Sequence, residues 1–260
     1  MSHFIRFYSG EGAPTILSRE VEGVLPLELP IGKREDVSFL ERRACIGFRA
    51  PDGYHECRNR AINIRQCPAC AFSDMAKAYT VGDFSGYPEL YEQAKQEEYC
   101  LYLAGFGEDI VKCGVTRKER FEERMREQGA DFGCVVAVQK GPDGIYGQES
   151  ALQSRFNFSN SVRLEQKMRR LVFDSQPARE NFKSAVELVR SSGVLADFSP
   201  QIIDFSSNYP RLHSPQRTLS VLGEILGAKG EILLFKSDGG RHFAVNMRQM
   251  TGLFFERKSE

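Results

Sequence analysis

The sequence predicts an α+β fold, in which a small mixed sheet with helices is joined to a cysteine-rich module and to β-rich ends. Three observations carry this prediction. Apolar and polar residues alternate near both ends, periodicity is lost around a group of cysteines, and strand-like and helix-like segments follow one another in the middle. The chain has 260 residues, of which 41% are hydrophobic, so it can bury a sizeable core.

The elements follow in order along the first part of the chain. Residues 1–30 alternate apolar and polar positions between Gly and Pro punctuation, which predicts two or three short strands. Residues 45–70 are rich in turn formers and show no periodicity. Residues 73–98 read as a connector with one helical segment near its end. We therefore expect a β-rich first region over residues 1–98.

The stretch "YCLYLAGFGEDIVKCGVT", residues 99–116, contains two apolar runs around a Gly-rich bend, a pattern typical of a β-hairpin. The pattern that follows predicts a helix, a strand and a second helix, over residues 117–128, 133–140 and 148–156. Together these segments predict a compact module over residues 99–160.

The remaining residues, 161–260, are expected to form a third region. Helical spacing marks residues 163–172 and 178–192, and "GEILLFKSDGGRHFAVNMRQMTGLFFE" reads as strand, tight turn and strand. Since both ends of the chain alternate, we expect the C-terminal hairpin to pair with the N-terminal strands.

Composition and charge restrict the class of protein. The N-terminus lacks a signal-peptide pattern, and no run of about 18 apolar residues occurs. These features predict a cytoplasmic protein with no membrane partner. Lys and Arg number 35, equal to Asp and Glu, so any nucleic-acid site has to be local rather than spread over the surface.

Four of the seven cysteines lie between positions 45 and 70. Cys67 and Cys70 form a C-x-x-C pair, whose two thiolates can face one ion, and Cys45 and Cys57 complete the four ligands that zinc accepts. His55 is an alternative to Cys57. Four thiolates leave no open position, which favours a structural role for zinc. A thioredoxin-like redox pair and chance clustering are the other interpretations.

The hairpin resembles the opening of the GIY-YIG nuclease domain. Tyr102 stands where the first signature Tyr would, Gly114 closes the second strand and Thr116 follows it. The next helix carries Arg124, and Glu149 lies in the helix after that. Together with "FEERMREQGAD" and "GAKGEILLF…NMRQMTG", the cysteine group and this module also resemble an uncharacterised prokaryotic family of unknown function.

The resemblance implies that a Tyr takes a proton from the attacking water, that the Arg neutralises charge and that the Glu holds a divalent cation. That cation would be magnesium or manganese. The second Tyr of the signature is Lys112 here, and Arg124 lies about two positions late. Lys112 can still hold a phosphate, or act as the base if burial lowers its pKa. For Arg124 the alternative is a solvated mixed-charge helix face, and for Glu149 a first-turn carboxylate favoured by the helix dipole.

The leading functional hypothesis is therefore a metal-dependent nuclease or nucleic-acid-processing enzyme, with DNA or RNA as its partner. The second is a zinc-containing nucleic-acid-binding protein that has lost the chemistry. A small-molecule transferase that uses the same pocket is a third, because a fold does not fix a function. Convergence of Tyr102, Lys112, Arg124 and Glu149 on one surface is the geometric feature that distinguishes the first hypothesis.

Overall fold

The computed structural model describes residues 1–21, 23–196 and 198–258, and its contacts divide the chain into two units. Unit 1 comprises Met1–Ala76 and Leu212–Glu260, and unit 2 comprises Lys77–Arg211. These boundaries differ from those expected after residues 98 and 160. The difference arises because strands from both ends of the chain share one sheet, which a reading along the chain cannot detect.

Unit 1 is built on a nine-stranded sheet with the order β11-β14-β13-β12-β4-β15-β1-β2-β3. All neighbouring strands are antiparallel except β11 and β14. The strands are β1 (Ser2–Tyr8), β2 (Thr15–Glu20), β3 (Gly23–Glu28), β4 (Arg34–Arg43), β11 (Gln216–Thr218), β12 (Ser220–Lys229), β13 (Ile232–Lys236), β14 (His242–Asn246) and β15 (Leu253–Arg257).

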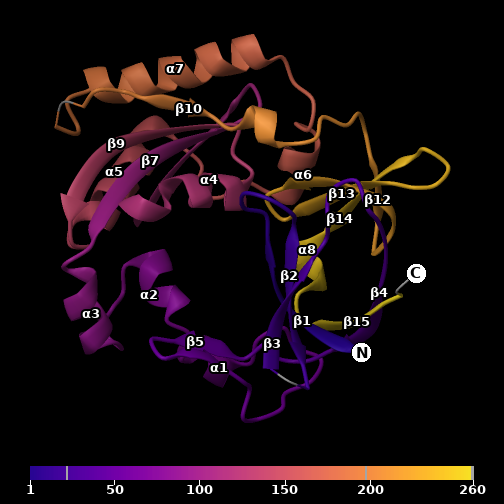
Figure 1. Cartoon of the computed structure of the whole chain (residues 1–260). Coiled ribbons are helices and arrows are strands. Elements are labelled where there is room, and N and C mark those ends of the chain that lie inside the picture. The colour runs from indigo at the N-terminus through magenta and orange to yellow at the C-terminus, as the bar shows by residue number, and fades with distance from the viewer. Residues whose placement is uncertain (22, 197, 259–260) are drawn as a thin grey trace. The chain divides into compact units, whose positions relative to one another are not determined.

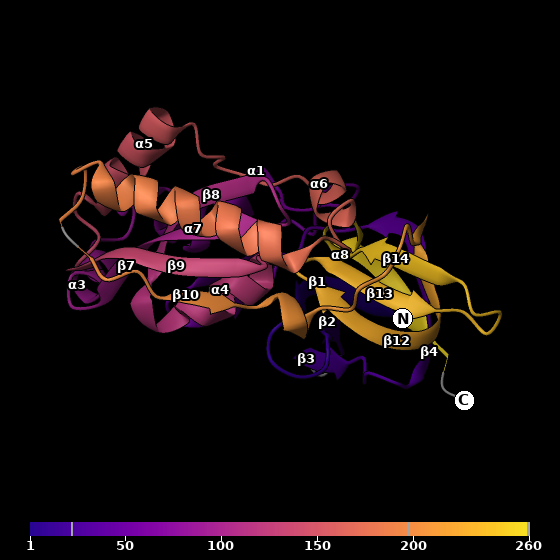
Figure 2. The same ribbon diagram turned by 90° about the horizontal axis from the view of Figure 1, so that it is seen from above.

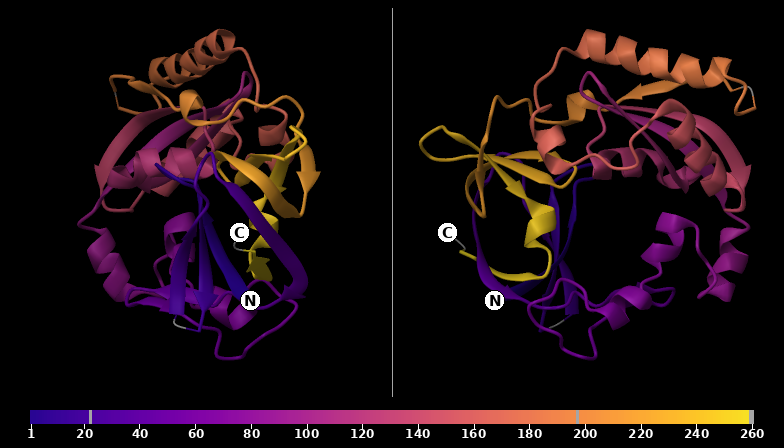
Figure 3. Two further views of the ribbon diagram at one scale, coloured as in Figure 1. Left: turned by 45° about the vertical axis from the view of Figure 1, so that its right-hand side comes forward. Right: turned by 180° about the vertical axis from the view of Figure 1, so that it is seen from behind.

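The first and last strands lie side by side (Figure 3). Ser2 of β1 pairs with Phe255 of β15, and the other edge of β15 pairs with β4. The expectation that the two ends share a sheet is confirmed. The strand that contacts β1 is β15, however, and not the hairpin β13–β14, which lies beyond β12 and β4.

Alternation along these strands puts one face of the sheet into a core. Its members include Phe4, Val37, Val221 and Phe255, together with Met250 of the short helix α8 (Met247–Met250). The long strands β4 and β12 have no counterpart in the sequence analysis. Charged residues interrupt the alternation in both strands, and glycines also interrupt it in β12. Some of these charges form ion pairs within the sheet.

Glu35 of β4 is 5% exposed and accepts two hydrogen bonds from Arg257 of β15, at 2.7 and 2.6 Å. A buried carboxylate needs such a partner, because an unpaired one would lose its hydration without compensation. This bidentate pair joins two strands that are far apart in sequence.

Unit 2 contains a four-stranded sheet with the order β10-β9-β7-β8 (Figure 1). The strands are β7 (Glu98–Phe106), β8 (Ile110–Arg117), β9 (Phe132–Lys140) and β10 (Ile202–Asp204). The helices are α2 (Ala76–Val81), α3 (Pro88–Ala94), α4 (Phe121–Gln128), α5 (Ile145–Phe156), α6 (Leu164–Met168) and α7 (Ser175–Ser191), with the 3-10 turns η1 (Lys118–Arg120) and η2 (Ser206–Asn208).

Two helices cover opposite faces of this sheet. Phe182 of α7 stacks on Phe132 of β9, and α7 lies over β7 and β9 (Figure 2). On the other face, Phe121 and Met125 of α4 pack with Tyr102, as the helical spacing of the two apolar residues predicts. The mixed α+β character predicted from the sequence is confirmed. None of the helices in the described residues is long and apolar enough to cross a membrane.

One helix boundary matters for the candidate site. Helix α5 begins at Ile145, three residues before the expected start at 148, so Glu149 lies in the second turn and not the first. The expectation of a first-turn carboxylate at Glu149 is therefore wrong. The helix dipole acts mainly within the first turn, so it does not account for a carboxylate at this position.

Candidate functional site

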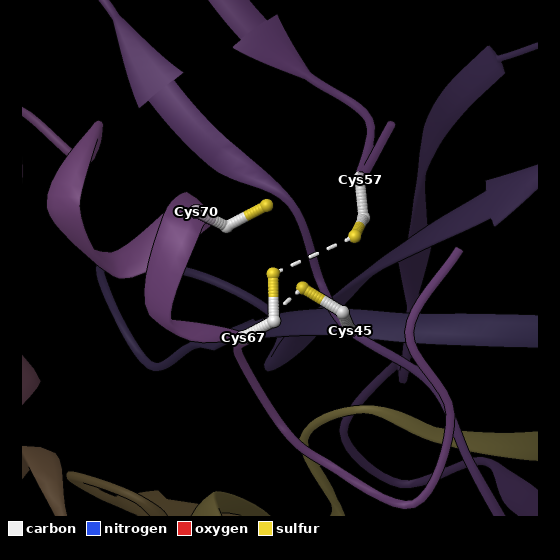
Figure 4. Close-up of side chains that lie close together, drawn as sticks. All are labelled: Cys45, Cys57, Cys67 and Cys70. Carbon is white, nitrogen blue, oxygen red and sulfur yellow. Dashed lines mark hydrogen bonds between the residues drawn. The ribbon is translucent and has the colours of Figure 1, made fainter. Parts of the chain in front are cut away.

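The four cysteines of unit 1 come together in one group. Cys45 follows β4, Cys57 follows the small hairpin of β5 (Phe48–Ala50) and β6 (Gly53–His55), and Cys67 and Cys70 open helix α1 (Pro68–Phe72). All four are buried, and their Sγ atoms lie within 4.8 Å of one another (Figure 4). Four thiols in this arrangement can hold a metal ion such as zinc.

The spacing of the sulfurs fits a tetrahedral thiolate site. Cys57 Sγ and Cys67 Sγ are 3.7 Å apart, too far for a disulfide and close to the ~3.8 Å that two Zn–S bonds of about 2.3 Å subtend at a tetrahedral ion. Cys57 is therefore a member of the group. His55, the alternative ligand, lies outside it; its Nε2 donates to Asp52 Oδ1 at 2.7 Å, and its ring stacks on Phe48.

Backbone amides support the thiolate form of these side chains. The N–H groups of Gly47 and Cys67 donate to Cys45 Sγ at 3.4 and 3.2 Å. The backbone N–H of Cys70 lowers the pKa of the Cys67 thiol to about 7. Burial raises the pKa of Cys45 and of Cys70. A bound cation would offset this cost of burial, because thiolates are the metal-binding form.

Gly47 is required by the fold of this group. Its φ is +77°, and a Cβ added there would lie 2.1 Å from the carbonyl oxygen of His55. The Cys67–Cys70 pair opens a helix, as redox pairs do, but turns and bends with an isolated bridge at Ile62 precede it instead of a strand. The arrangement therefore favours a metal centre over a thioredoxin-like pair.

The second group of candidate residues lies in unit 2. Tyr102 comes from β7, Lys112 from β8, Arg124 from α4 and Glu149 from α5. All four side chains interact electrostatically, since Arg124 and Glu149 both influence the pKa values of Tyr102 and Lys112. Four residues that span 48 positions of the sequence are thus brought to one place.

Gln128 connects two members of this group. Its Nε2 donates to the Tyr102 hydroxyl at 2.8 Å, and its Oε1 accepts from Lys112 Nζ at 2.6 Å. The positive charge of Arg124 lowers the pKa of the Tyr102 hydroxyl, against the larger effect of burial. Gln128 was not identified from the sequence. The spacing could have revealed it: Gln128 lies seven residues after Phe121 and three after Met125, so it shares the buried face of α4. A polar side chain on that face needs hydrogen-bond partners.

Burial changes the pKa values of Tyr102 and Lys112 in opposite directions, and so decides which of them can accept a proton. Tyr102 is 1% exposed and packs in the core, and burial raises the pKa of its hydroxyl. Lys112 is half-buried, and desolvation, with the charges of Arg124 and Lys167, lowers its pKa from 10.5 to about 8. Near neutral pH Lys112 is therefore a better proton acceptor than Tyr102.

Glu149 is half-buried, and burial raises its pKa while Lys112 and a hydrogen bond from Gln153 Nε2, at 3.1 Å, lower it. Its charge interacts with that of Lys112. A carboxylate in such a place can bind a divalent cation together with water and a phosphate, the usual ligand set of magnesium.

Three of the arginines in and just before α4 lie at helical spacing and have different partners. Arg117 pairs with Glu97 at 2.9 Å, and Arg120 with Glu123 at 2.9 Å. Arg124 pairs with Glu127 at 3.0 Å, and Glu127 also accepts from Arg120. Of these three, Arg124 is the one whose charge influences the pKa of Tyr102. The other three cysteines, Cys100, Cys113 and Cys134, are fully buried, where a free cysteine behaves as a small apolar residue.

A family model described as "Protein of unknown function (DUF2797)" matches residues 32–255. The chain belongs to this family. The DUF2797 match includes the cysteine group, all of unit 2 and the C-terminal strands through Phe255. No curated protein and no solved structure gives a significant match to the chain.

Proposed function

We propose that this chain is a metal-dependent nuclease or nucleic-acid-processing enzyme of GIY-YIG type, acting through unit 2. The observation that carries the proposal is the convergence of Tyr102, Lys112, Arg124 and Glu149 from four elements. The order of those elements also supports it. A hairpin with a Tyr on its first strand is followed by a helix with an Arg and, after a third strand, by a helix with a Glu.

The proposed roles follow from burial and charge. Lys112, with its lowered pKa, accepts the proton of the attacking water, the role that the second Tyr would otherwise share. Arg124 binds the phosphate, because a guanidinium offers a planar fork of donors. Gln128, itself bonded to the Tyr102 hydroxyl, holds Lys112 in place, and Glu127 holds Arg124.

Glu149 is the residue that would hold magnesium or manganese. When bound, such an ion supplies positive charge that stabilises the leaving oxygen of a phosphodiester. Glu149 fits this role because it is the half-buried carboxylate of the group, and carboxylate oxygens are the protein ligands that magnesium takes.

In unit 1 we propose that the four cysteines bind zinc in a structural role. Four buried sulfurs would fill the tetrahedron, which leaves no position for a catalytic water. Cys57 and Cys67 flank residues 58–66, so the ion would fix both ends of this segment.

A second function is supported by a separate observation. Tyr102 is almost completely buried, and a Lys stands where the signature has its second Tyr. These features favour a zinc-containing nucleic-acid-binding protein without catalysis, in which Arg124 and Lys112 hold a phosphate. The equal numbers of acidic and basic residues make such binding local rather than spread over the whole surface.

Cleavage of labelled single- and double-stranded DNA and RNA, with magnesium or manganese, tests the proposal on the full chain. We expect Glu149→Gln to abolish cleavage while it leaves folding and nucleic-acid affinity unchanged, because only the metal ligand is lost. We expect Arg124→Ala to weaken both binding and cleavage. Glu180→Gln removes an exposed carboxylate of α7 and is the matched control, which should cleave as the unmodified chain does.

Wild-type chain that cuts none of these substrates with either metal, yet binds one of them with an affinity that Arg124→Ala lowers, would establish the binding function instead. Cleavage that survives Glu149→Gln would contradict the proposed metal ligand.

A further inference from the structure

A groove of about 650 Å³ lies in unit 1, apart from the cysteine group and from the polar group of unit 2. Strand β4 forms one wall with Phe39, Leu40 and Arg43, and the turn from β14 into α8 forms another with Asn246 and Arg248. The segment before Cys67 contributes Arg65. The volume falls within the usual range of small-molecule sites, roughly 300 to 1,000 Å³.

Positive charge gathers in this groove. Three guanidinium groups line it, those of Arg43, Arg65 and Arg248, against the single carboxylate of Glu41. Arg248 has only a long ion pair, 3.8 Å, with Glu231, and the exposed side chain of Arg65 has no ion pair or hydrogen bond among the described residues. An arginine cluster with so little internal neutralisation suits a phosphate group.

Two buried polar atoms in the groove residues have no hydrogen-bond partner in the described part of the chain. They are Arg43 Nε, a donor, and Asn246 Oδ1, an acceptor. Asn246 precedes α8 but its side chain does not cap that helix. A buried polar atom without a partner is unfavourable, so a ligand toward which these side chains turn would supply the hydrogen bond that each atom lacks.

The rest of the groove is apolar. Leu219 is 68% exposed at its edge, and Phe39, Met250 and Leu253 line it. Apolar walls can accommodate a flat ring. A surface made of arginines alone would bind a bare phosphate as well as a larger ligand, and would not distinguish them. The groove therefore combines three guanidinium groups with apolar walls, one donor and one acceptor. This combination favours a ligand that carries both a phosphate and a flat polar ring over a bare phosphate.

We propose that this groove binds a nucleoside phosphate, with the base between the apolar walls and near Asn246, and the phosphate among the arginines. Carboxamides and guanidinium groups are the side chains that recognise base edges most often. The ligand is either a free mononucleotide or one nucleotide of a single strand. The proposal does not rest on the proposed function, because every residue that it uses lies in unit 1.

The cysteine group contributes to this groove through Arg65. The backbone N–H of Asn63 donates to Arg43 O, and that of Ile46 donates to Arg65 O, both at 2.9 Å. Cys57 and Cys67 bound the same segment, so a metal bound by the four cysteines would also fix Arg65 beside Arg43. Metal loading is therefore expected to set the affinity of the groove.

Isothermal titration calorimetry on the full chain tests the proposal, with AMP, GMP, CMP, UMP, adenosine and inorganic phosphate as probes. We expect at least one nucleotide to bind more tightly than adenosine and than phosphate. Arg65→Ala should weaken nucleotide binding about tenfold, since a charged hydrogen bond is lost. Asn246→Ala should weaken nucleotides but leave any binding of phosphate unchanged. The matched control is Arg58→Ala, an exposed residue of the same segment outside the groove, with no expected effect.

A trinucleotide with a 5′-phosphate separates the two sources of the ligand. Tighter binding of the trinucleotide assigns the groove to single strands, and tighter binding of the mononucleotide assigns it to free nucleotides. No binding of any nucleotide at millimolar concentration overturns the proposal, as does phosphate binding as tightly as nucleotides or unchanged affinity in Arg65→Ala. Glu149→Gln should keep the nucleotide affinity, so failure of this proposal and failure of the proposed nuclease function are distinguishable.

Discussion

Gly114 is the position at which the candidate site of unit 2 is most sensitive to a single methyl group. It pairs with Tyr102 across strands β7 and β8, and the ring of Tyr102 lies over it. A Cβ at Gly114 would lie 2.4 Å from the Tyr102 hydroxyl oxygen and 2.5 Å from Cζ. The ring is 1% exposed and packs against Phe121, so it has little room to move away. We therefore expect Gly114→Ala to displace Tyr102 from its hydrogen bond with Gln128.

The magnitude follows from three terms. Overpacking a filled core costs about 1 to 3 kcal/mol. Loss of the bond between Gln128 and Tyr102 costs about 1 kcal/mol more. Replacing Gly in a strand recovers about 0.5 to 1 kcal/mol, because Ala loses less chain entropy on folding. The net expectation is a loss of about 1 to 3 kcal/mol in the free energy of unfolding.

Urea unfolding followed by circular dichroism measures this change, and hydrogen exchange of peptides from β7 and β8 locates it in unit 2. The matched control is Gly147→Ala in helix α5, where an added Cβ meets nothing within 4 Å. That control should stabilise the chain by about 0.5 to 1 kcal/mol, because Ala is the better helix former.

A double-mutant cycle with Tyr102→Leu tests the cause. The shorter side chain leaves space for the new methyl group, so Gly114→Ala should cost less in the Leu background than in the unmodified chain. An equal cost in both backgrounds, or a change below about 0.5 kcal/mol in the unmodified one, would refute the steric reasoning.

Two further predictions concern the metal centre and Lys112. Chain prepared without chelator should contain one zinc ion per molecule, measured by elemental analysis, and Cys70→Ser should lose both the ion and thermal stability, whereas Cys134→Ser should keep the ion. A zinc-free preparation would end this interpretation. Since the pKa of Lys112 falls from 10.5 to about 8 on folding, the unfolded chain binds more protons between these pH values, and the free energy of unfolding should rise with pH across them. Lys112→Met removes the cost of burying a charged Lys112. Measured by urea titration, the variant should therefore be more stable than the unmodified chain below pH 8, and this difference in the free energy of unfolding should shrink toward pH 10.5. A difference that does not change with pH would show that burial does not perturb Lys112.

Local patterns were enough to predict the parts of the chain that fold from neighbouring residues. The hairpin over 99–116 corresponds to β7 and β8, and the helix predicted over 178–192 overlaps α7, which begins three residues earlier and ends at Ser191. The four cysteines were also grouped correctly, because C-x-x-C places two ligands by itself and turn-rich chain can bring in two more.

Long-range pairing could not be predicted in this way. Strand β4 carries charged residues at positions that become buried, and Glu35 is satisfied only by Arg257, more than two hundred residues later. Strand β12 contains Gly223 and Gly227, and the register of its pairing with β13 shifts between Ile225 and Gly227. In β12 the glycines interrupt the alternation that marks a strand.

The partners of Tyr102 were missed for a related reason. Gln128 ends a helix whose pattern shows a buried face, but the pattern does not say which strand residue that face meets. The start of α5 was missed in a similar way. The sequence before it is rich in turn formers, namely Gly141, Pro142, Gly144 and Gly147, which hides the helix start at Ile145. Glu149 was therefore expected in the first turn of the helix, whereas it lies in the second.

The position of β15 between β4 and β1 has a consequence for the synthesis of the chain. Until residues 253–257 leave the ribosome, the sheet of unit 1 exists only as two separate pieces, β11-β14-β13-β12-β4 and β1-β2-β3, each with an unpaired edge. Unit 2 is continuous over Lys77–Arg211 and can fold earlier. The N-terminal strands therefore wait through the synthesis of all of unit 2, and premature termination at Gly252 would release a chain with two open sheet edges, a form prone to aggregate or to attract chaperones.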